Sequence, residues 1–358
     1  MTYYPENVKN SYGSSLPDEP EFETSRLDTM PLPLKPNDPV RCKLHPWFED
    51  WQSELRQAIT DSDELCRILA IRPCLVPTDY PLLVPRSFVD LMERGNPNDP
   101  LLLQVLPRSD ENQPAHEFSK DPLGEIANTE GGIALNKYTG RILLFASQKC
   151  AVHCRFCFRR HFPKALADAD TLLAPIRHNT AVEEVILSGG DPLMLDDDAF
   201  DRLLKSIQQI EHVRRIRIHS RLPIVLPSRL TSTLADILTL PIPVYLVLHV
   251  NHPNELSDDF LARRALMMKP VVMAQTVLLR NINDNAETLA RLFHRLIDAR
   301  ILPYYLHQLD RVEGAAHFEV PSERGLELLS EVRNRLPGYA VPVYVREIAG
   351  KNCKEVIT

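Results

Sequence analysis

Several features that mark particular classes of protein are missing from this sequence. No apolar run is long enough to cross a bilayer as a helix. The opening residues, MTYYPENVKN, lack the charged-then-apolar pattern of a secretory signal. Basic residues are not in excess either, because 41 Lys and Arg stand against 48 Asp and Glu, a net charge of −7. We therefore expect no membrane partner and no nucleic-acid partner.

Cysteine is scarce and forms no disulfide pattern. The chain has 7 cysteines, an odd number, and three of them are clustered at Cys150, Cys154 and Cys157. We expect a reducing, cytoplasmic environment, which an exposed thiol cluster bound to iron would require. Three further thiols have no ligand-like spacing and are expected to be ordinary: Cys42, Cys66 and Cys74.

The clustered cysteines follow an apolar run, 142–146 (ILLFA), that predicts a buried strand. Their spacing is Cys-x3-Cys-x2-Cys, on the loop that leaves the strand. Thiolates are soft ligands for iron, zinc or copper(I). Three of them leave a structural zinc site one ligand short. The interpretations are a zinc site completed elsewhere, thiols without metal, or a [4Fe–4S] cluster whose fourth iron is open to a small molecule.

The chain divides into four stretches by composition and pattern. Residues 1–44 are rich in Pro and acidic residues and predict a disordered or extended arm. Residues 45–135 hold short helical patterns and form an N-terminal helical region. Residues 136–340 alternate predicted strands with helices, and residues 341–358 form a C-terminal segment.

Alternation between strands and helices predicts an α/β fold. Six short apolar or β-branched runs are expected to be strands: 142–147, 184–188, 214–219, 244–250, 271–278 and 303–309. This pattern implies a parallel sheet with helices outside it, here six units of a partial barrel. Reactive groups of parallel barrels lie at the carboxyl ends of strands. Asp284 and Glu287 have the spacing of a capping box and predict the start of one helix.

Several motifs resemble the lysine 2,3-aminomutase family of radical S-adenosylmethionine (SAM) enzymes over nearly all of residues 45–354. The motifs are CRFCFRRHFP at 154–163, LSGGDPLM at 187–194, RIHSRLPIVLP at 217–227, HVNHPNEL at 249–256 and QTVLLRNINDN at 275–285. The resemblance implies a partial (β/α)6 radical SAM barrel and an isomerase that moves the amino group of L-lysine. It also implies a [4Fe–4S] cluster on the three cysteines, SAM on the open iron, and pyridoxal 5′-phosphate (PLP).

The resemblance assigns further residues to SAM or cofactor contacts. These residues lie at predicted strand ends: Ser188, Gly189, Gly190, Asp191, Ser220, Arg221, His249 and Gln275. Paired glycines allow a backbone to approach a ligand closely, although the same letters also make a plain strand-to-helix turn. Each polar residue of the set could equally be a satisfied group in the barrel mouth.

The C-terminus carries the expected PLP lysine. GYAVP at 338–342 matches a family stretch that precedes a strand and then the lysine that forms the Schiff base. Family spacing falls on Lys354, the expected catalytic residue. A family glycine-rich run is replaced here by AGKNC at 349–353, so Lys351 is a rival, and Cys353 has no assigned role. The resemblance adds two PLP contacts, Tyr138 and Arg141.

Substrate residues are also implied by the resemblance. Arg159 is expected to bind the lysine carboxylate, which suits a planar guanidinium. Asp310 and Glu347 are expected to hold the distal ammonium. Glu347 stands where the family has an Asp, and His307 replaces a family Tyr. Two acids favour lysine over the alternative substrate glutamate.

Within the family, VPRSF at 84–88 and GNPNDPLL at 95–102 resemble the branch that makes (R)-β-lysine for elongation factor P. The end of the chain four residues after Lys354 favours the same branch over the catabolic one. The expected partners are an electron donor such as flavodoxin or ferredoxin and, functionally, the elongation factor P ligase. A homo-oligomer is left open. The alternatives are an aminomutase acting on free lysine or another amino acid, and a structural zinc-binding module.

Overall fold

The computed structural model of this chain describes residues 50–73, 76–126, 128–163 and 168–358. These ranges fall within one unit, Arg41–Thr358. The expected N-terminal arm, residues 1–44, and two of the expected ordinary thiols, Cys42 and Cys74, lie outside the described residues. The third, Cys66, is buried in the core and belongs to no disulfide.

Short helices make up the predicted N-terminal region. They are α1 (Trp51–Arg56), α2 (Ser62–Ile68), α3 (Arg86–Val89), and the 3-10 turns η1 (Leu102–Gln104) and η2 (Ser109–Asn112). Asp50 and Asp61 begin α1 and α2, because each carboxylate accepts a backbone N–H of the first turn. Leu65, Phe88 and Leu101 are fully buried, so the region packs as part of the core.

A ten-stranded sheet organises the rest of the chain. Its strands, in chain and spatial order, are β1 (Thr129–Glu130), β2 (Ala134–Tyr138), β3 (Arg141–Ser147), β4 (Glu184–Gly189), β5 (Arg215–Ser220), β6 (Val244–His249), β7 (Val271–Val277), β8 (Leu302–His307), β9 (Val343–Arg346) and β10 (Glu355–Val356). Strands β3 to β9 are parallel, and β2 and β10 add antiparallel edges. Within the described residues β1 and β10 are the two ends of this order, so the sheet is open. The predicted partial barrel is confirmed, and β9 is one parallel strand more than the six predicted runs.

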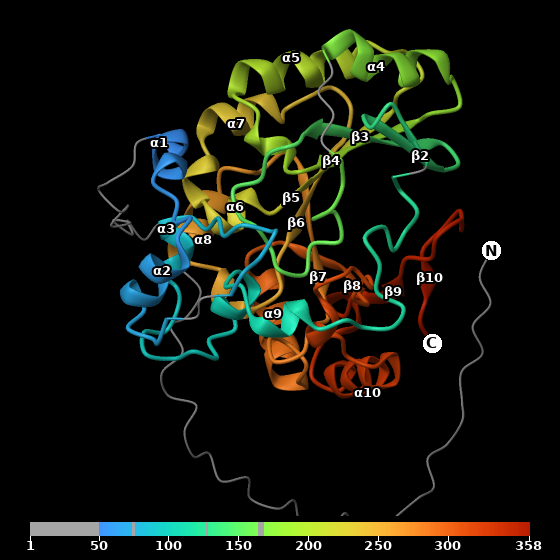
Figure 1. The fold of residues 1–358 in the computed structure, drawn as a ribbon. Coiled ribbons are helices and arrows are strands. Elements are labelled where there is room, and N and C mark those ends of the chain that lie inside the picture. The colour runs from blue at the N-terminus through green and yellow to red at the C-terminus, as the bar shows by residue number, and fades with distance from the viewer. Residues whose placement is uncertain (1–49, 74–75, 127, 164–167) are drawn as a thin grey trace, which may run out of the picture. The chain divides into compact units, whose positions relative to one another are not determined.

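Helices connect the parallel strands. They are α4 (Ala169–His178), α5 (Asp197–Gln208), α6 (Leu222–Val225), α7 (Ser232–Ile237), α8 (Asp258–Arg264), α9 (Ala286–Asp298) and α10 (Ser322–Arg333), with 3-10 turns η3 (Pro192–Met194), η4 (Pro227–Arg229), η5 (Pro253–Glu255), η6 (Ala316–Phe318) and η7 (Gly338–Ala340). Figure 1 shows α5 and α7 together at one part of the sheet, and α9 beside α10 at another. None of the helices in these ranges combines the length and apolar character needed to span a membrane.

The capping box predicted at Asp284 and Glu287 is wrong. Helix α9 begins after Asn285, whose side chain accepts the backbone N–H of Thr288 at 2.8 Å. The Glu287 carboxylate instead pairs with Arg335 of the segment that follows α10, at 2.7 Å. Asn and Asp cap helices about equally well, so spacing alone did not separate the two candidates.

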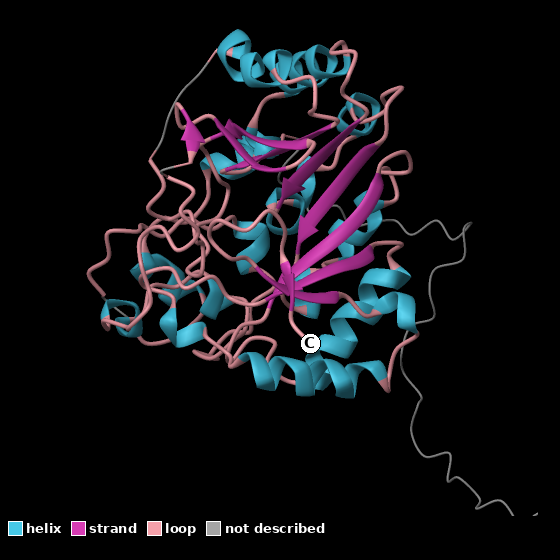
Figure 2. Cartoon of the chain, turned by 90° about the vertical axis from the view of Figure 1, so that its right-hand side faces the viewer, coloured by secondary structure: helices cyan, strands magenta, loops and turns pink. Residues whose placement is uncertain are grey.

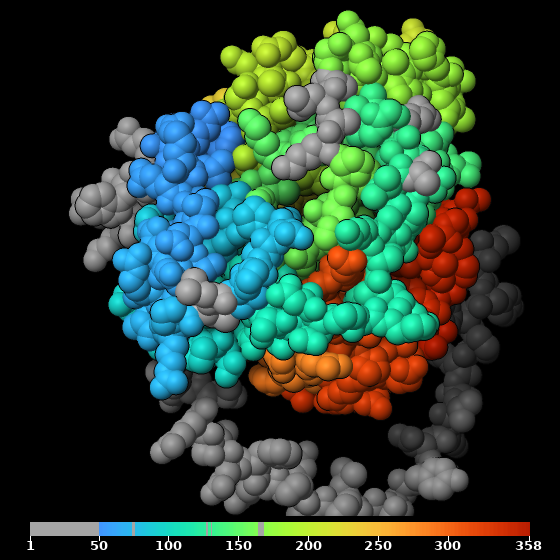
Figure 3. All heavy atoms as spheres, viewed as in Figure 1, coloured from blue at the N-terminus to red at the C-terminus, as the bar shows by residue number. Residues whose placement is uncertain are grey.

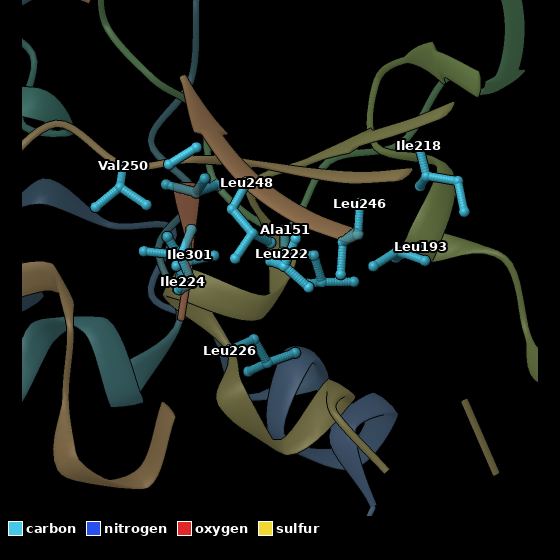
Figure 4. Close-up of a cluster of buried hydrophobic side chains, with 14 of the residues drawn as sticks. Ala151, Leu193, Ile218, Leu222, Ile224, Leu226, Leu246, Leu248, Val250 and Ile301 are labelled. Atoms are coloured by element: carbon cyan, nitrogen blue, oxygen red, sulfur yellow. The ribbon is translucent and has the colours of Figure 1, made fainter. Parts of the chain in front are cut away.

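Alternation along the strands separates the apolar core from the polar barrel interior. In β5, Ile216 and Ile218 are fully buried against the helices, whereas Arg217 and His219 face the other way. The long central strands point to one side, where the long loops gather (Figure 2). Figure 4 shows part of the main apolar cluster, to which both Ala151 of the cysteine motif and Leu222 belong. The loop that bears the thiols is therefore anchored in the main core.

Candidate active site

The cysteine motif follows β3 and is fastened by the N-terminal region. The backbone N–H of Arg155 donates to the Gln104 carbonyl at 2.9 Å, and that of His153 donates to the Leu83 carbonyl at 2.9 Å. The Arg155 side chain is fully buried and bonds Glu111 at 2.7 Å. In the space-filling view the blue and teal N-terminal region lies against the green segment that holds the motif (Figure 3). The region therefore fixes the conformation of the thiol loop.

The paired glycines at the end of β4 allow its backbone to pack closely against the backbone that leads into the cysteine loop. A Cβ atom on Gly190 would lie 2.4 Å from the Lys149 carbonyl oxygen, one residue before Cys150. On Gly189, whose φ of +111° also favours glycine, it would lie 2.7 Å from the Ser147 oxygen. The two glycines thus seat the start of the cysteine loop against the end of β4.

The three thiols are partly buried and lie near positive charge. Burial raises the pKa of Cys154 to about 11 and raises that of Cys157. The Arg221 guanidinium acts in the opposite direction on Cys154, since its Nη1 donates to the sulfur at 2.9 Å. Burial raises the pKa of the Tyr80 hydroxyl, and charge on all three thiols raises it further. Tyr80 therefore lies close to all three.

The thiols do not form a cage for one metal ion. No three His, Cys, Asp or Glu side chains among the described residues could hold a single ion. A cluster makes a different demand, because each cysteine binds a separate iron atom. A cationic donor on Cys154 fits a thiolate that carries charge, and so the residues present fit an iron–sulfur cluster.

Arg221 is held by a buried polar network. Its Nη2 donates to the side-chain amide oxygen Oε1 of Gln104 at 2.7 Å and lies 3.5 Å from the fully buried Glu255. Gln104 in turn donates to Glu255 at 2.9 Å. The carboxylate also accepts the backbone N–H of His252 at 3.0 Å. These contacts therefore fix the orientation of the Arg221 guanidinium toward the Cys154 thiol.

Asp191 ties the ends of β4 and β5 together. Its carboxylate accepts the Ser220 hydroxyl at 2.8 Å and the backbone N–H groups of Arg221 and Leu222 at 2.8 and 2.9 Å. It also accepts the N–H of Leu193 at 3.0 Å. Asp191 and Ser220 thus bond each other and position Arg221.

Arg159 lies at the barrel mouth beside β4. Its Nε and Nη2 bond the Glu125 carboxylate at 2.8 and 3.2 Å, and its Nη1 bonds the Ser188 hydroxyl at 3.2 Å. Glu125 thus occupies one edge of the guanidinium with a carboxylate. The edge that faces Ser188 is the one available to a second anion.

The C-terminal group forms around Glu347, just after β9. The Glu347 carboxylate accepts Lys137 at 2.7 Å and also bonds Lys354 and the Tyr138 hydroxyl. These donors, led by Lys354, lower the pKa of Glu347 to about 2 against the effect of burial. The Arg141 guanidinium stacks 4.8 Å from the Tyr138 ring centre. Lys354, Tyr138, Arg141 and Glu347 therefore form one group.

The rival lysine lies elsewhere. The Lys351 side chain is half exposed and pairs with Glu355 at 2.9 Å on the outer face. Lys354 is more buried and lies 6.0 Å from the centre of the Tyr305 ring inside the barrel. Cys353, between them, is exposed.

Asp310 follows β8 and adjoins a cavity of about 600 Å³ that Glu347 also lines. Burial raises the pKa of Asp310 to about 7, and the positive charge of Lys354 opposes that shift. Within the described ranges neither an ion pair nor a hydrogen bond engages its carboxylate. Asp310 is therefore a carboxyl group without a partner in this part of the chain, close enough to Lys354 for the charge of that lysine to act on its pKa.

Two half-buried histidines in the barrel interior, His219 and His307, each have a buried ring nitrogen without a partner among the described residues. The Nε2 atoms of His219 and His307 have no hydrogen-bond partner among the described residues. Burial lowers the pKa of both, and the charge of Lys354 lowers each further. A phosphorylated pyridine is rich in acceptors, so donors without partners beside a lysine fit PLP.

His249 and Gln275 lie side by side at the ends of β6 and β7. The His249 ring bonds Asn251 at 3.1 Å and meets the edge of the Phe156 ring in the cysteine motif. Burial lowers its pKa to about 3, so the ring is neutral. These two residues therefore lie between the thiol loop and the barrel interior.

Several contact residues had no signal in the sequence. No motif indicated the partners that reach the site from outside the parallel strands: Tyr80, Gln104, Glu111, Glu125 and Lys137. All of them precede the cysteines, in the N-terminal region or on β2. Their positions depend on how that region packs against the barrel.

A parallel open barrel with three clustered thiols after its first parallel strand and a half-buried lysine beyond its last has its reactive groups at the strand ends, which is the arrangement of an α/β barrel enzyme. The chain is 44% identical over 324 residues to L-lysine 2,3-aminomutase of Escherichia coli (strain K12), which covers 86% of this chain and 94% of that protein. The enzyme of the same name from Haemophilus influenzae is 38% identical, covering 85% and 94%. The one from Clostridium subterminale is 31% identical, covering 85% and 76%.

A radical SAM methyltransferase from Sphaerobacter thermophilus aligns with a TM-score of 0.45 and 20% identity, over 60% of this chain and 68% of that one. No family model matches the chain. The identities to the curated enzymes show that the chain belongs to the L-lysine 2,3-aminomutase family. It is therefore an isomerase of the aminomutase type.

Proposed function

We propose that this enzyme is a PLP-dependent radical SAM aminomutase that converts L-lysine to (R)-β-lysine. The observation that carries the proposal is the group of Lys354, Glu347 and Asp310, because it combines a nucleophilic amine with two acids that suit a distal ammonium. The three thiols after β3 supply the second half of the argument, together with membership of the family.

Each cofactor has assigned residues. Cys150, Cys154 and Cys157 would hold a [4Fe–4S] cluster whose remaining iron binds SAM, and Lys354 would hold PLP. When bound, the cluster with SAM supplies a hydrogen-abstracting radical, and PLP supplies a π bond across which nitrogen can migrate. An amine that forms an imine with PLP must be deprotonated.

The chain itself binds and orients the substrate. The Nη1 edge of Arg159, with Ser188, would take the α-carboxylate, because Glu125 already occupies the other edge. The unpaired Asp310 would take the distal ammonium, and Glu347 would share it. Acids in this place would repel a side-chain carboxylate, so glutamate is a poor substrate on the same reasoning.

The test is anaerobic reconstitution with iron, sulfide, PLP, SAM and lysine, followed by product analysis. We expect (R)-β-lysine, with turnover lost in Cys154→Ser and in Lys354→Ala. Borohydride trapping should label Lys354, with Lys351→Ala as the matched control that still traps. Trapping at neither lysine, or full turnover of Cys154→Ser, would contradict the proposal.

Two rivals give different results in the same experiment. Faster turnover of glutamate than of lysine would overturn the lysine pocket. Colourless protein with stoichiometric zinc would favour a structural metal site.

We further propose that the product serves elongation factor P and that a flavodoxin or ferredoxin reduces the cluster. Support comes from the stretches at 84–88 and 95–102, which resemble that branch of the family. The check is whether the purified product is a substrate of the elongation factor P ligase. Racemic β-lysine would remove this assignment.

A further inference from the structure

Two side chains from outside the cysteine motif, Arg221 and Tyr80, lie against its thiols. Arg221, just after β5, donates from Nη1 to the Cys154 sulfur at 2.9 Å. Tyr80, from the segment between α2 and α3, stacks its ring on His153 of the motif at 4.9 Å, and its hydroxyl lowers the pKa of the Cys157 thiol against the effect of burial. The sequence motifs of the family do not assign Tyr80 any role.

The Arg221 side chain is buried and held in one conformation by its neighbours. It is 6% exposed, and its second terminal nitrogen is held by Gln104 at 2.7 Å. Its charge is balanced by the buried Glu255 at 3.5 Å. The guanidinium also lies 5.4 Å from the centre of the Phe156 ring, inside the motif. Its remaining edge therefore faces the sulfur.

The position of the Tyr80 ring is also fixed by several contacts. Its ring stacks on His153 at 4.9 Å, within the motif, and the guanidinium groups of Arg155 and Arg160 lie 5.0 and 4.7 Å from its centre. Its carbonyl oxygen accepts Arg155 Nη1 at 2.7 Å. The Tyr80 ring is therefore held in one position beside the motif.

A hydrogen bond to a cluster sulfur affects the two oxidation states differently. The reduced cluster carries one more negative charge, which concentrates electron density on the sulfurs. Donors and nearby cations therefore stabilise the reduced state more, and so they raise the reduction potential. A donor protein of the flavodoxin or ferredoxin class supplies the electron, and no other bond changes in that step.

We propose that Tyr80 and Arg221 are positioning residues that set the reduction potential of the iron–sulfur cluster through hydrogen bonds to the Cys157 and Cys154 sulfurs. This inference rests on the proposed function, because it requires that the three cysteines hold a cluster. The inference also gives the N-terminal region a role at the cluster, because Tyr80 belongs to that region.

The test for Tyr80 is the Tyr80→Phe variant of the full-length enzyme, which loses the hydroxyl and keeps the stacked ring. The cluster is reconstituted anaerobically, reduced stepwise with dithionite, and followed by electron paramagnetic resonance. We expect a normal iron content and a more negative midpoint. At a fixed potential the ratio of reduced to oxidised cluster should fall by up to about tenfold, which corresponds to about 59 mV for one electron.

The matched control is Tyr344→Phe. The Tyr344 hydroxyl is also buried, and it bonds Gln308 on β8's trailing segment. Its removal should leave the midpoint unchanged. An equal shift in both variants would mean that the potential follows general loosening of the protein.

The test for Arg221 removes its positive charge together with the negative charge of its partner Glu255. Arg221→Gln leaves Glu255 buried without its cation, so the double variant Arg221→Gln/Glu255→Gln is measured beside Glu255→Gln alone. The double variant should have the more negative midpoint of the two, because only it lacks the donor to Cys154.

Each outcome has a definite meaning. If the wild-type protein assembles no cluster, the proposed function fails before the variants are compared. If it assembles one and Tyr80→Phe and the double variant both keep the wild-type midpoint, the inference is overturned. Loss of iron from Tyr80→Phe while the fold persists by circular dichroism would also overturn it, since the residue would then retain the cluster and not tune it.

Discussion

At the scale of single residues, Asp310 makes ligand binding depend on pH. Burial raises its pKa to about 7, with Glu347 and Glu125 adding to the shift and Lys354 and Lys137 opposing it. The carboxyl group must be ionised to hold an ammonium. We expect the affinity for lysine to fall as pH drops below about 7, by at most about tenfold per unit for one proton. Anaerobic titration of lysine at several pH values measures this.

Asp310→Asn is the control for that dependence and adds a stability test. It should bind lysine weakly at every pH, without the slope. A folded-state pKa raised above the ordinary value of 3.8 contributes stability at low pH that is lost as pH rises toward about 7. Asp310→Asn should therefore unfold at a higher temperature than the wild type near pH 8 and not near pH 4. If the affinity of the variant for lysine depended on pH as it does in the wild type, the proton would belong to another group.

At the scale of elements, the junction between the cysteine loop and the end of β4 depends on Gly190. Gly190→Ala would put a Cβ atom 2.4 Å from the Lys149 oxygen, which belongs to backbone. We expect a loss of about 1–3 kcal/mol of stability and weaker iron retention, because the loop before Cys150 must shift. Gly338→Ala is the control, since nothing lies within 4 Å of its Cβ position. Denaturant unfolding and iron analysis measure both, and equal effects would contradict the close-packing argument.

A second element-scale prediction concerns the clamp between the N-terminal region and the motif. Glu111 and Arg155 are almost completely buried and bond at 2.7 Å. Glu111→Gln should cost about 3 kcal/mol, because it leaves a buried cation without its anion. The pair Glu111→Leu/Arg155→Met should recover part of the loss. Denaturant unfolding of the wild type, Glu111→Leu, Arg155→Met and the pair gives the coupling energy, and additive effects would show that the ion pair is not coupled.

At the scale of the whole molecule, the two proposed cofactor sites lie on different parts of the sheet. The thiols follow β3, and Lys354 precedes β10 at the other end of the strand order. Lys354→Ala should therefore keep its iron and lose PLP, and Cys157→Ser should lose iron and keep PLP. Iron, sulfide and PLP stoichiometry of each purified variant is the measurement. Loss of both cofactors in either variant would show that one site depends on the other for its fold.

The sequence by itself determined the architecture and the reactive groups. The hydrophobic period of a strand or helix is a local property, because it depends on which residues within a short segment must be buried. For this reason the six predicted runs coincide with β3 to β8. The thiol spacing is local for the same reason. The start of α9 was mispredicted, since Asp284 and Asn285 are both good caps and only packing chose between them.

The tertiary structure alone decided which distant groups meet. Lys354 rather than Lys351 faces the barrel interior, and Glu347 joins Lys354 to Lys137, which lies 210 residues away from Glu347. Arg221 reaches Cys154 across 67 residues of sequence. Contacts of this kind depend on the packing of whole elements and leave no period or spacing in the chain. For that reason the sequence predicted what chemistry the site can carry, and the fold decided how each group is held and charged.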